Sequence, residues 1–493
     1  RSILHVDMNA CYASIECLYN PSIRDKPVAV GGDAEARHGI ILAKNQIAKK
    51  YGVTTGEALW QAKQKCPQLV IIKPHYDRYL RFSALARKIY NSYTDQVESF
   101  GLDECWLDVS GSVHLFGDST LIAEEIRERV KRELGITVSV GVSYNKVFAK
   151  LGSDLKKPDA VSVLTRDNYR DKVWPLPASD LLYVGRATTR KLYNHGIETI
   201  GQLANTDPEL LQAWFGKVGM ILYWFANGLD NSPVMAVGDE TIIKSIGNST
   251  TTPRDLMNEL DAKIVFYMLA ESVAERIRDH GFLAKTVQIS VRDNGLFWFQ
   301  KQMKLDEPTC LASELCDTAM ELLRTSYRWQ NPIRSIGIRG CDLIPATTPK
   351  QLKLFEDEAE REKLEQLERT VDDIRRRFGH DDDRTAAEPG GGERHALRVV
   401  AGRGADHAAL ELLRRQAGDL VVGAAQLEGK HRLHVLALEQ NLVAGPGRQV
   451  GGQFKRGFDG DVVNLSVEDF FEIIRVHWAQ LIQAKGRFYG WSG

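Results

Sequence analysis

The stretch HVDMNACYASIE, residues 5–16, places one carboxylate, Asp7, at the end of an apolar run and follows it with small residues and Tyr12. The apolar run that leads to Asp7 predicts a strand. Farther along the chain, VESFGLDECWLDVSG predicts two strands that meet near Asp103 and Glu104. If that turn lies beside the end of the first strand, three carboxylates from distant segments meet at one place.

Three neighbouring carboxylates repel one another, by about 4 kcal/mol for each pair of unit charges 4 Å apart at an effective dielectric constant near 20. A divalent cation relieves this repulsion. Because the cluster offers oxygen ligands and neither histidine nor thiolate, it favours Mg²⁺ or Mn²⁺. Two such ions about 3.5 to 4 Å apart stabilise both the attacking and the leaving oxygen of a phosphoryl transfer. The alternative interpretation is that these acids only end strands or cap turns.

The composition sets the class of protein. The chain has 493 residues, 43% of them hydrophobic, and a formal net charge of -1, so we expect a multidomain soluble protein. It has no apolar stretch near the roughly 20 residues of a membrane span and no signal-peptide pattern at its start, so we expect a cytoplasmic location and no membrane partner. Seven cysteines without a CxxC pair indicate neither a disulfide framework nor a zinc site.

The order of predicted elements indicates an α+β protein. Residues 3–160 alternate short β-branched runs with amphipathic helices that end at glycine. Residues 174–229 have a wholly helical pattern, and residues 244–345 predict the order strand, helix, strand, strand, helix, strand. In TVQISVRDNG, residues 286–295, apolar and polar side chains alternate, which predicts a sheet with one packed and one solvent-exposed face; DNG is a hairpin signal.

VDMNACYASIE and SFGLDECWLD together resemble the two metal-binding motifs of the Y-family DNA polymerases, the lesion-bypass group that includes bacterial DNA polymerase IV and the catalytic subunit of polymerase V. The resemblance continues in family order through AKNQIAKKYGV, GVSYNKVFAKLGSDLKKPD, GIETIGQLA and IRSIGIRG, and covers roughly residues 3–380. It implies an α+β multidomain enzyme shaped like a right hand, with a ferredoxin-like palm, small fingers, a helix-hairpin-helix thumb and an α+β little finger.

The motifs and the changes in composition together suggest domain boundaries. We expect the palm at 1–19 and 77–165, the fingers at 20–76, the thumb at 166–230, a linker at 231–243, the little finger at 244–345, a tail at 346–380 and an extension of unknown role at 381–493.

Within this resemblance, Asp7, Asp103 and Glu104 match the catalytic, metal-binding carboxylates, and the backbone carbonyl of Met8 matches a position that often joins the metal shell. The implied cofactor is a pair of Mg²⁺ ions, with Mn²⁺ as a substitute. Tyr12 matches the steric gate, whose ring excludes a 2′-hydroxyl from the sugar of the incoming nucleotide. The alternative for Tyr12 is simple helix packing.

The resemblance also implies nucleotide-binding residues. Lys49 and Lys157 align with basic residues that hold the triphosphate, and Lys44 and Gln46 can share this work. Lysine stands where arginine is common at the first of these positions, and Gln46 stands where some members have tyrosine, so the chain departs from the family pattern here. A lysine acts as a point charge, whereas an arginine can bind two oxygens at once. The alternative is that lysines on a helix form only a solvated face.

DNA contacts are expected in the thumb and the little finger. The segment LLYVGRATTRKLYNHGIETIGQLA resembles a helix-hairpin-helix, whose backbone amides near Gly185, Arg186 and Thr188 hold a phosphate without reading sequence. The family often has a second glycine where Arg186 or Ala187 stands. Basic residues outnumber acidic ones along the little-finger strands, so one sheet face should be positive and bind the DNA backbone. The expected contacts there are Lys244, Arg292, Lys304, Arg334 and Arg339.

Two features lie beyond the little finger. QLKLF, residues 351–355, resembles the bacterial sliding-clamp-binding motif, with Gln351, Leu354 and Phe355 as its anchors. Residues 381–460 then hold fourteen glycines and nine arginines but only two lysines, which differs from the lysine-rich chain before them. We therefore expect residues 381–493 to be a fused or frame-shifted extension that nucleotide addition does not need.

The expected function is that of a template-directed DNA polymerase of the translesion type. It would add deoxynucleotides, supplied as triphosphates, to the 3′-hydroxyl of primer–template DNA by two-metal phosphoryl transfer. From the sequence alone two alternatives stay open. One is another two-metal palm nucleotidyl enzyme such as a cyclase, suggested by VGGD at 30–33. The other is a noncatalytic, clamp-bound lesion-bypass scaffold, against which the presence of all three acids argues.

Overall fold

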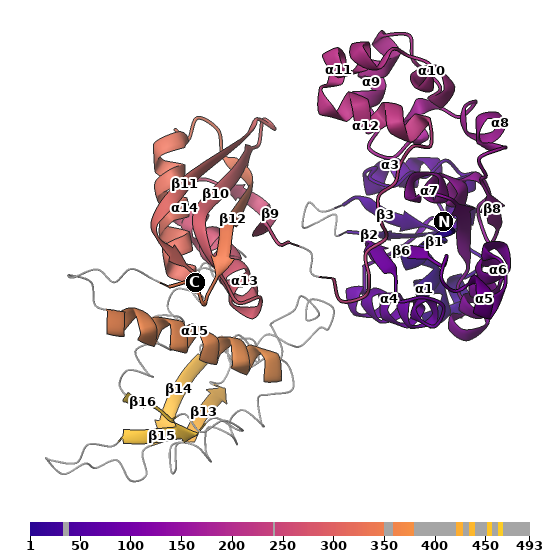
Figure 1. Cartoon of the computed structure of the whole chain (residues 1–493). Coiled ribbons are helices and arrows are strands. Elements are labelled where there is room, and N and C mark those ends of the chain that lie inside the picture. The colour runs from indigo at the N-terminus through magenta and orange to yellow at the C-terminus, as the bar shows by residue number, and fades with distance from the viewer. Residues whose placement is uncertain are drawn as a thin grey trace, which may run out of the picture. The chain divides into compact units, whose positions relative to one another are not determined.

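The computed structural model describes residues 1–32, 39–239, 242–349 and 358–378, together with four short strands between residues 421 and 466. The chain divides into two compact units, Arg1–Thr241 and Ile242–Gly493. The boundary between them falls inside the expected linker. Figure 1 colours the elements of both units in chain order.

The first unit is built around the five-stranded sheet of the palm. Its strand order is β5-β6-β1-β7-β8, with β7 and β8 parallel and all other neighbours antiparallel. The strands are β1 (Ile3–Met8), β5 (Val97–Phe100), β6 (Glu104–Asp108), β7 (Val138–Ser143) and β8 (Val161–Val163). β1 lies in the centre and is buried at all six positions. The strands expected around Asp7 and on both sides of Asp103 are therefore confirmed.

Helices cover both faces of the palm sheet. They are α1 (Cys11–Tyr19), α4 (Tyr76–Asn91), α5 (Val113–Phe116), α6 (Ser119–Leu134) and α7 (Lys146–Leu155). Leu4 and Val6 pack into the core formed with α1, α4 and α6. On the other face α7 lies so close to β7 that a Cβ on Gly141 would be 1.8 Å from the carbonyl oxygen of Ala149. Asp7 lies on the α7 face, because alternate strand residues point to opposite sides.

The rest of the first unit forms the expected fingers and thumb regions. A three-stranded sheet with order β3-β2-β4 and short helices makes the fingers; its elements are η1 (Pro21–Ile23), β2 (Val28–Gly31), β3 (Ile41–Lys44), α2 (Gln46–Lys50), α3 (Leu59–Lys65) and β4 (Val70–Ile72). The thumb is helical, as expected. Its elements are α8 (Tyr169–Val173), η2 (Ala178–Asp180), α9 (Arg186–Asn194), α10 (Ile200–Ala204), α11 (Pro208–Phe215) and α12 (Lys217–Ala226).

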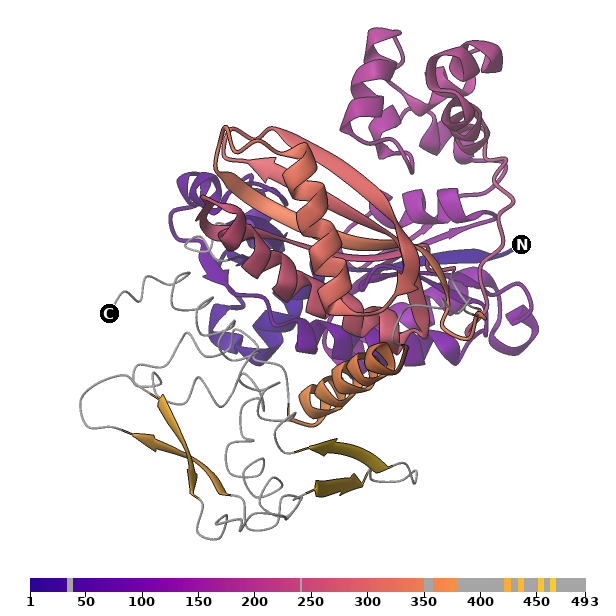
Figure 2. The same ribbon diagram turned by 90° about the vertical axis from the view of Figure 1, so that its left-hand side faces the viewer.

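The second unit contains a four-stranded antiparallel sheet with order β11-β10-β12-β9. Its elements are β9 (Ser245–Leu256), α13 (Glu259–Asp279), β10 (Phe282–Asp293), β11 (Trp298–Thr309), α14 (Ala312–Ser326) and β12 (Ile333–Pro345). Figure 2 shows α13 and α14 side by side across one face of this sheet. Val287, Ile289 and Val291 of β10 are fully buried against them. The predicted element order, hairpin and two-faced sheet are therefore confirmed, and with them the α+β fold class.

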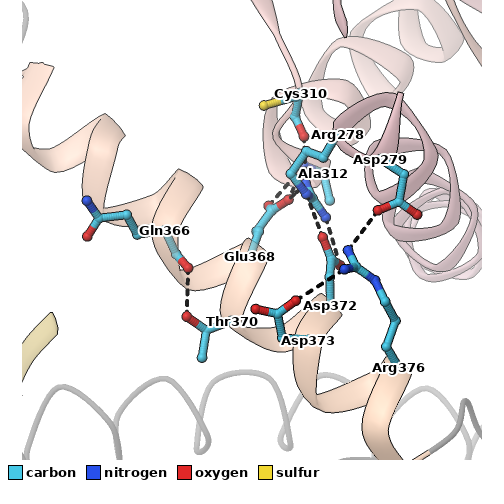
Figure 3. Close-up of polar contacts among 10 residues, drawn as sticks. All are labelled: Arg278, Asp279, Cys310, Ala312, Gln366, Glu368, Thr370, Asp372, Asp373 and Arg376. Atoms are coloured by element: carbon cyan, nitrogen blue, oxygen red, sulfur yellow. Dashed lines mark hydrogen bonds and ion pairs between the residues drawn. The ribbon is translucent and has the colours of Figure 1, made fainter. Parts of the chain in front are cut away.

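A helix stands where the sequence predicts a tail. α15 (Glu358–Phe378) packs on the little finger, where Asp372 pairs with Arg278 (Figure 3). The prediction of a tail at 346–380 did not include this helix. In the extension the described strands form two antiparallel pairs, β13 (Val421–Gln426) with β14 (Leu433–Leu438) and β15 (Gly451–Lys455) with β16 (Val462–Ser466). Among the residues that the structure describes, no helix combines the length and the apolar character of a membrane span.

Candidate active site

Strand register brings the acids of the expected cluster together. In the antiparallel pair of β1 and β6, Asp7 lies directly opposite Glu104. Beside this pair, the Met8 N–H donates a hydrogen bond to the carbonyl oxygen of Asp103 at 3.0 Å. Strand pairing and this backbone hydrogen bond therefore bring together the two distant segments that carry Asp7, Asp103 and Glu104.

Two lysines accompany the acids. Lys157 Nζ lies 2.6 Å from Asp7 Oδ2, and Lys150 Nζ lies 2.5 Å from Glu104 Oε2. Across the described ranges, no three His, Cys, Asp or Glu side chains form a preassembled metal-binding group. The carboxylate donors nevertheless suit a hard divalent ion, because such an ion would take over the neutralising role that the two ammonium groups hold.

Glu104 is held from a second side by His5. His5 is fully buried; its Nε2 lies 3.3 Å from Glu104 Oε2 and its Nδ1 lies 2.9 Å from Ser153 Oγ. α7 supplies both Ser153 and Lys150. α7, which can pack closely on the sheet because residue 141 is glycine, therefore helps to position the Glu104 carboxylate.

The electrostatics differ between the acids. Burial raises the pKa of Asp7 to about 6, although an ammonium group lies nearby. Burial, followed by the charge of Glu104, also raises the pKa of Asp103. Burial acts on Glu104 in the same direction, but its polar contacts with His5 and Lys150 outweigh burial and lower the pKa of Glu104 to about 2. Asp7 is therefore the acid whose ionised form gains most from an added cation.

Tyr12 stands on a rigid aromatic support. Ala10 adopts a left-handed conformation with φ of 47° and turns the chain sharply from β1 into α1. The Tyr12 ring stacks on Tyr79 with centroids 4.1 Å apart and an interplanar angle of 6°, and it meets Tyr76 edge-on at 6.1 Å. The Tyr79 hydroxyl in turn donates a hydrogen bond to Glu16 Oε1 at 2.7 Å. This support fixes the position of the Tyr12 ring, whose role as a gate stays a prediction.

A cavity of about 190 Å³ opens beside Asp7. It is lined by Asp7, Asn9, Ala10, Lys44, Gln46, Lys49 and Lys157. All four residues expected to contact the triphosphate thus line one cavity together with an expected metal ligand. Lys44 and Lys49 come from the fingers region, whereas Lys157 follows α7. Burial, followed by the charge of Lys49, lowers the pKa of Lys44.

Sequence reasoning missed three residues of this site: His5, Asn9 and Lys150. Asn9 Nδ2 donates to Ser139 Oγ at 2.9 Å, and its Oδ1 accepts from the Asp159 N–H at 2.9 Å. Asn9 therefore ties the end of β1 to β7 and to the loop that follows α7. All three lie inside the quoted motifs, which was the signal that could have found them.

The thumb residues lie at an open helix end. Gly185 is the N-cap of α9. Because glycine has no side chain, it donates no capping group to the helix, and a Cβ at this position would meet nothing within 4 Å. Arg186 is exposed and Thr188 is half-buried in the first turn. Backbone amides at a helix start attract a phosphate, so this geometry is compatible with the expected contact.

Three of the expected DNA-binding cations share one face of the little-finger sheet. Arg339 lies opposite Gln288, Arg292 opposite Trp298, and Lys304 opposite Thr286. These positions alternate with the buried ones, so they lie on the face that the helices leave open. Arg334 stands half-buried at a register shift of β12, and Lys244 is exposed just before β9.

A second cavity, of about 330 Å³, lies at the β9 edge of this sheet. It is lined by Ser245, Ile246, Gly247, Arg276, His280 and Arg339. Arg276 donates hydrogen bonds to the carbonyl oxygens of Ser272 at 3.0 Å and Gly247 at 3.1 Å. Arg276 and His280 were not expected here, because they lie at the end of α13 and directly after it and not in a strand. The expected clamp-binding residues Gln351, Leu354 and Phe355 lie outside the described residues.

Three segments of the chain match known protein families. Residues 6–154 match the impB/mucB/samB family, residues 243–354 match the C-terminal domain of that family, and residues 179–230 match the thumb domain of DNA polymerase-iota. These ranges contain all three acids, the α9 start and the little-finger sheet.

Similar proteins support the same grouping. DNA polymerase IV of Acetivibrio thermocellus is 56% identical over 380 residues, which cover 77% of this chain and 95% of that protein. DNA polymerase IV of Pelotomaculum thermopropionicum is 37% identical over 377 residues, 76% of this chain and 92% of that protein. A solved Y-family DNA polymerase chimera, Dbh-Dpo4-Dbh, shares the fold with a TM-score of 0.61 and 22% identity, over 70% of this chain and 100% of the chimera.

Proposed function

Because the chain belongs to the Y family of DNA polymerases, we propose that Asp7, Asp103 and Glu104 bind two divalent metal ions and carry its reaction. It is a template-directed, lesion-bypass DNA polymerase of the DNA polymerase IV type, with DNA and deoxynucleotides as its substrates. Neither a nucleotidyl cyclase nor a noncatalytic scaffold finds support among its relatives.

The observation that carries the site is the register of β1 and β6. It sets Glu104 opposite Asp7, which lines a cavity together with Lys44, Lys49 and Lys157. Paired acids beside a cluster of cations are what a metal-bound triphosphate requires, since the acids hold the metal and the cations hold the phosphates.

The family is metal-dependent; the choice of Mg²⁺, with Mn²⁺ as a substitute, and the number of two ions are our proposal. Bound ions would activate the primer 3′-hydroxyl for attack on the α-phosphate and offset the charge of the leaving pyrophosphate. Asp7, Asp103, Glu104 and the carbonyl oxygen of Met8 would hold them.

The other residues of the site bind and select the nucleotide. Lys44, Lys49 and Lys157 neutralise phosphate oxygens, and Gln46 supplies an uncharged hydrogen-bonding group on the same wall of the cavity. Tyr12, fixed by its stacked neighbour, fills the space that a 2′-hydroxyl would need, so ribonucleotides are excluded by contact.

Primer extension by Asp103→Ala and Glu104→Ala tests the metal assignment. We expect either variant to lose most of its activity with Mg²⁺ or Mn²⁺, while its affinity for primer–template DNA, measured by fluorescence anisotropy, stays the same. Asp25→Ala is the matched control, because Asp25 is an exposed acid of the same unit. Near-normal extension by either active-site variant would refute the assignment.

The DNA contacts are part of the same proposal. Backbone amides at Gly185, Arg186 and Thr188 hold a phosphate at the start of α9. In the little finger, phosphates lie along the open sheet face and at the edge cavity, and the proposed contacts are Lys244, Arg276, His280, Arg292, Lys304, Arg334 and Arg339. Contacts of this kind bind without reading sequence, which suits an enzyme that copies damaged templates.

We further propose that residues 351–355 bind a bacterial sliding clamp through Gln351, Leu354 and Phe355. Binding to a clamp raises the effective concentration of the polymerase at the primer end. The full chain should bind purified clamp, and the triple alanine variant of these residues should not. Equal clamp affinity of the two proteins would refute the proposal.

A further inference from the structure

The hairpin between β10 and β11 exposes consecutive large apolar side chains at its tip, residues 293–298. Leu296 is 64% exposed, Phe297 is 66% exposed and Trp298 is 49% exposed. A run of exposed apolar residues is a liability in a folded domain unless it serves a function, because it promotes aggregation. The hairpin tip is therefore a candidate binding element of the little finger.

Hydrogen bonds hold this hairpin tip in one conformation. The carboxylate of Asp293 is buried; its Oδ1 accepts from the Phe297 N–H at 2.9 Å, and its Oδ2 accepts from Asn331 Nδ2 at 2.9 Å. The Asn294 N–H donates to the carbonyl oxygen of Pro332 at 2.9 Å. The tip is thus tied to the segment that leads into β12, and it loses little conformational freedom when it binds a ligand.

Trp298 lies on the open face of the little-finger sheet. In the register of β10 and β11 it stands directly opposite Arg292, and residues that face each other across two strands point to the same side. The next pair, Val291 and Phe299, points to the helices. Val291 is buried, and Phe299 stacks on Tyr327 at the end of α14 with ring centroids 6.0 Å apart. The Trp298 indole therefore stands beside an exposed arginine on the face that we propose to bind DNA.

The open face around Trp298 carries positive charge and uncharged polar groups. Its registered rows, from β11 through β10 to β12, are Trp298, Arg292 and Ser335, then Gln300, Ser290 and Gly337, then Gln302, Gln288 and Arg339. None of these positions holds an acid, so the surface suits a polyanion. An indole ring neutralises no phosphate. It does suit another part of a nucleic acid, the flat face of a base.

We propose that the hairpin tip is a stacking site for an unpaired base of the template strand, with the Trp298 indole as its platform. The inference rests on the proposed DNA contacts of the open sheet face and adds a contact to a base. In a duplex, neighbouring base pairs cover the faces of each base and leave only its edges to a protein. A stacked base must therefore come from the single-stranded part of the template. Because every base has such a face, the contact tolerates any template sequence.

The affinity of the full chain for matched DNAs tests this site by fluorescence anisotropy. The DNAs share one duplex, which is blunt, or carries a template overhang of about eight nucleotides, or carries the same overhang built of abasic sugars. We expect the natural chain to prefer the overhang with bases over the abasic overhang. Trp298→Ala should reduce this preference by about 5-fold or more, which is the lower end of what one base–aromatic stack contributes. Its affinity for the blunt duplex should not change.

Two further variants separate stacking from other contacts. Trp298→Phe keeps an aromatic ring but removes the indole N–H, so it should retain most of the preference for bases. A loss as large as that of Trp298→Ala would indicate a hydrogen bond from the indole and would overturn the stacking site. Met268→Ala is the matched control and should change nothing, because Met268 is an exposed apolar residue of α13, on the other side of the sheet.

The outcomes separate this inference from the proposed DNA face. An equal preference for bases in the natural chain and in Trp298→Ala overturns the stacking site, and so does an equal loss of affinity of that variant for all the DNAs. If Arg339→Ala leaves the salt dependence of binding to the blunt duplex unchanged, the phosphate contact of the open face fails instead. The comparison with abasic DNA then still decides whether Trp298 contacts a base.

Discussion

Replacing Asp7 by asparagine should make the first unit more stable when no divalent metal is present. The carboxylate is buried and its ordinary pKa of 3.8 is raised to about 6, so at neutral pH the folded protein keeps a charge that its surroundings disfavour. Asparagine has nearly the same shape and cannot ionise. The proposed catalytic acid thus lowers the stability of the metal-free fold.

The size of the effect follows from the pKa shift. A raised pKa contributes stability that is complete below pH 3.8 and is lost as the pH rises through about 6. With about 1.4 kcal/mol for each pKa unit, ionised Asp7 destabilises the fold by about 3 kcal/mol at pH 7.5 and by about half as much at pH 5. For a unit of this size 1 kcal/mol moves Tm by about 2 to 4 °C, so Asp7→Asn should gain roughly 6 to 12 °C at pH 7.5.

Thermal unfolding in the presence of a metal chelator, at pH 7.5 and at pH 5, measures the difference in Tm between Asp7→Asn and the natural chain. The gain should shrink to about half at the lower pH, and the exposed control Asp25→Asn should stay within about 0.5 kcal/mol of the natural chain at both. Added Mg²⁺ should stabilise the natural chain more than Asp7→Asn, because only the natural chain has the full set of acids. A variant that is less stable than the natural chain in chelator at pH 7.5 would refute the reasoning.

Three further predictions concern packing, selection and DNA binding. Gly141→Ala should lower the free energy of unfolding by about 3 kcal/mol, because its Cβ would collide with the backbone of α7; Gly111→Ala, with open space around it, should be neutral in the same urea titration. Tyr12→Ala should reduce the preference for deoxynucleotides over ribonucleotides by about 10- to 200-fold in kcat/KM, whereas Tyr12→Phe should keep it; unchanged selection by the alanine variant would make Tyr12 a packing residue. Arg339→Ala should lower the slope of log affinity against log salt by about 0.9, and an unchanged slope would place Arg339 off the DNA backbone.

Local patterns were sufficient to predict much of the fold. The alternation of Val287, Ile289 and Val291 with polar residues fixes the buried face of β10, because strand residues alternate by geometry alone. The meeting of Asp7 with Glu104 was predictable from two motifs, since Asp7 lies near the end of β1 and Glu104 begins β6, its antiparallel neighbour. The separation of the two motifs along the chain did not hinder this prediction, because each motif could be identified as a strand by itself.

The remaining parts depend on contacts that no local pattern reveals. His5 and Lys150 lie inside the quoted motifs, but the motifs do not show that their side chains meet Glu104; Lys150 reaches it from α7, which packs closely on the sheet at Gly141. The sequence indicates only a tail where α15 stands, because the arginines and acids of this helix have their partners about 50 to 100 positions away, as Asp372 does with Arg278. A charged helix in an ordered domain cannot be told from an exposed one until those partners are known.

The pairing of Lys157 with Asp7 has a consequence for the order in which ligands bind. One ammonium group cannot serve an acid and a phosphate fully at the same time, so a free nucleotide competes with the protein for Lys157. When a divalent ion satisfies Asp7, the lysine becomes available to the nucleotide. Metal and nucleotide should therefore bind with positive cooperativity, each raising the affinity for the other by the same factor, and the site should respond to the two together far more than to either alone.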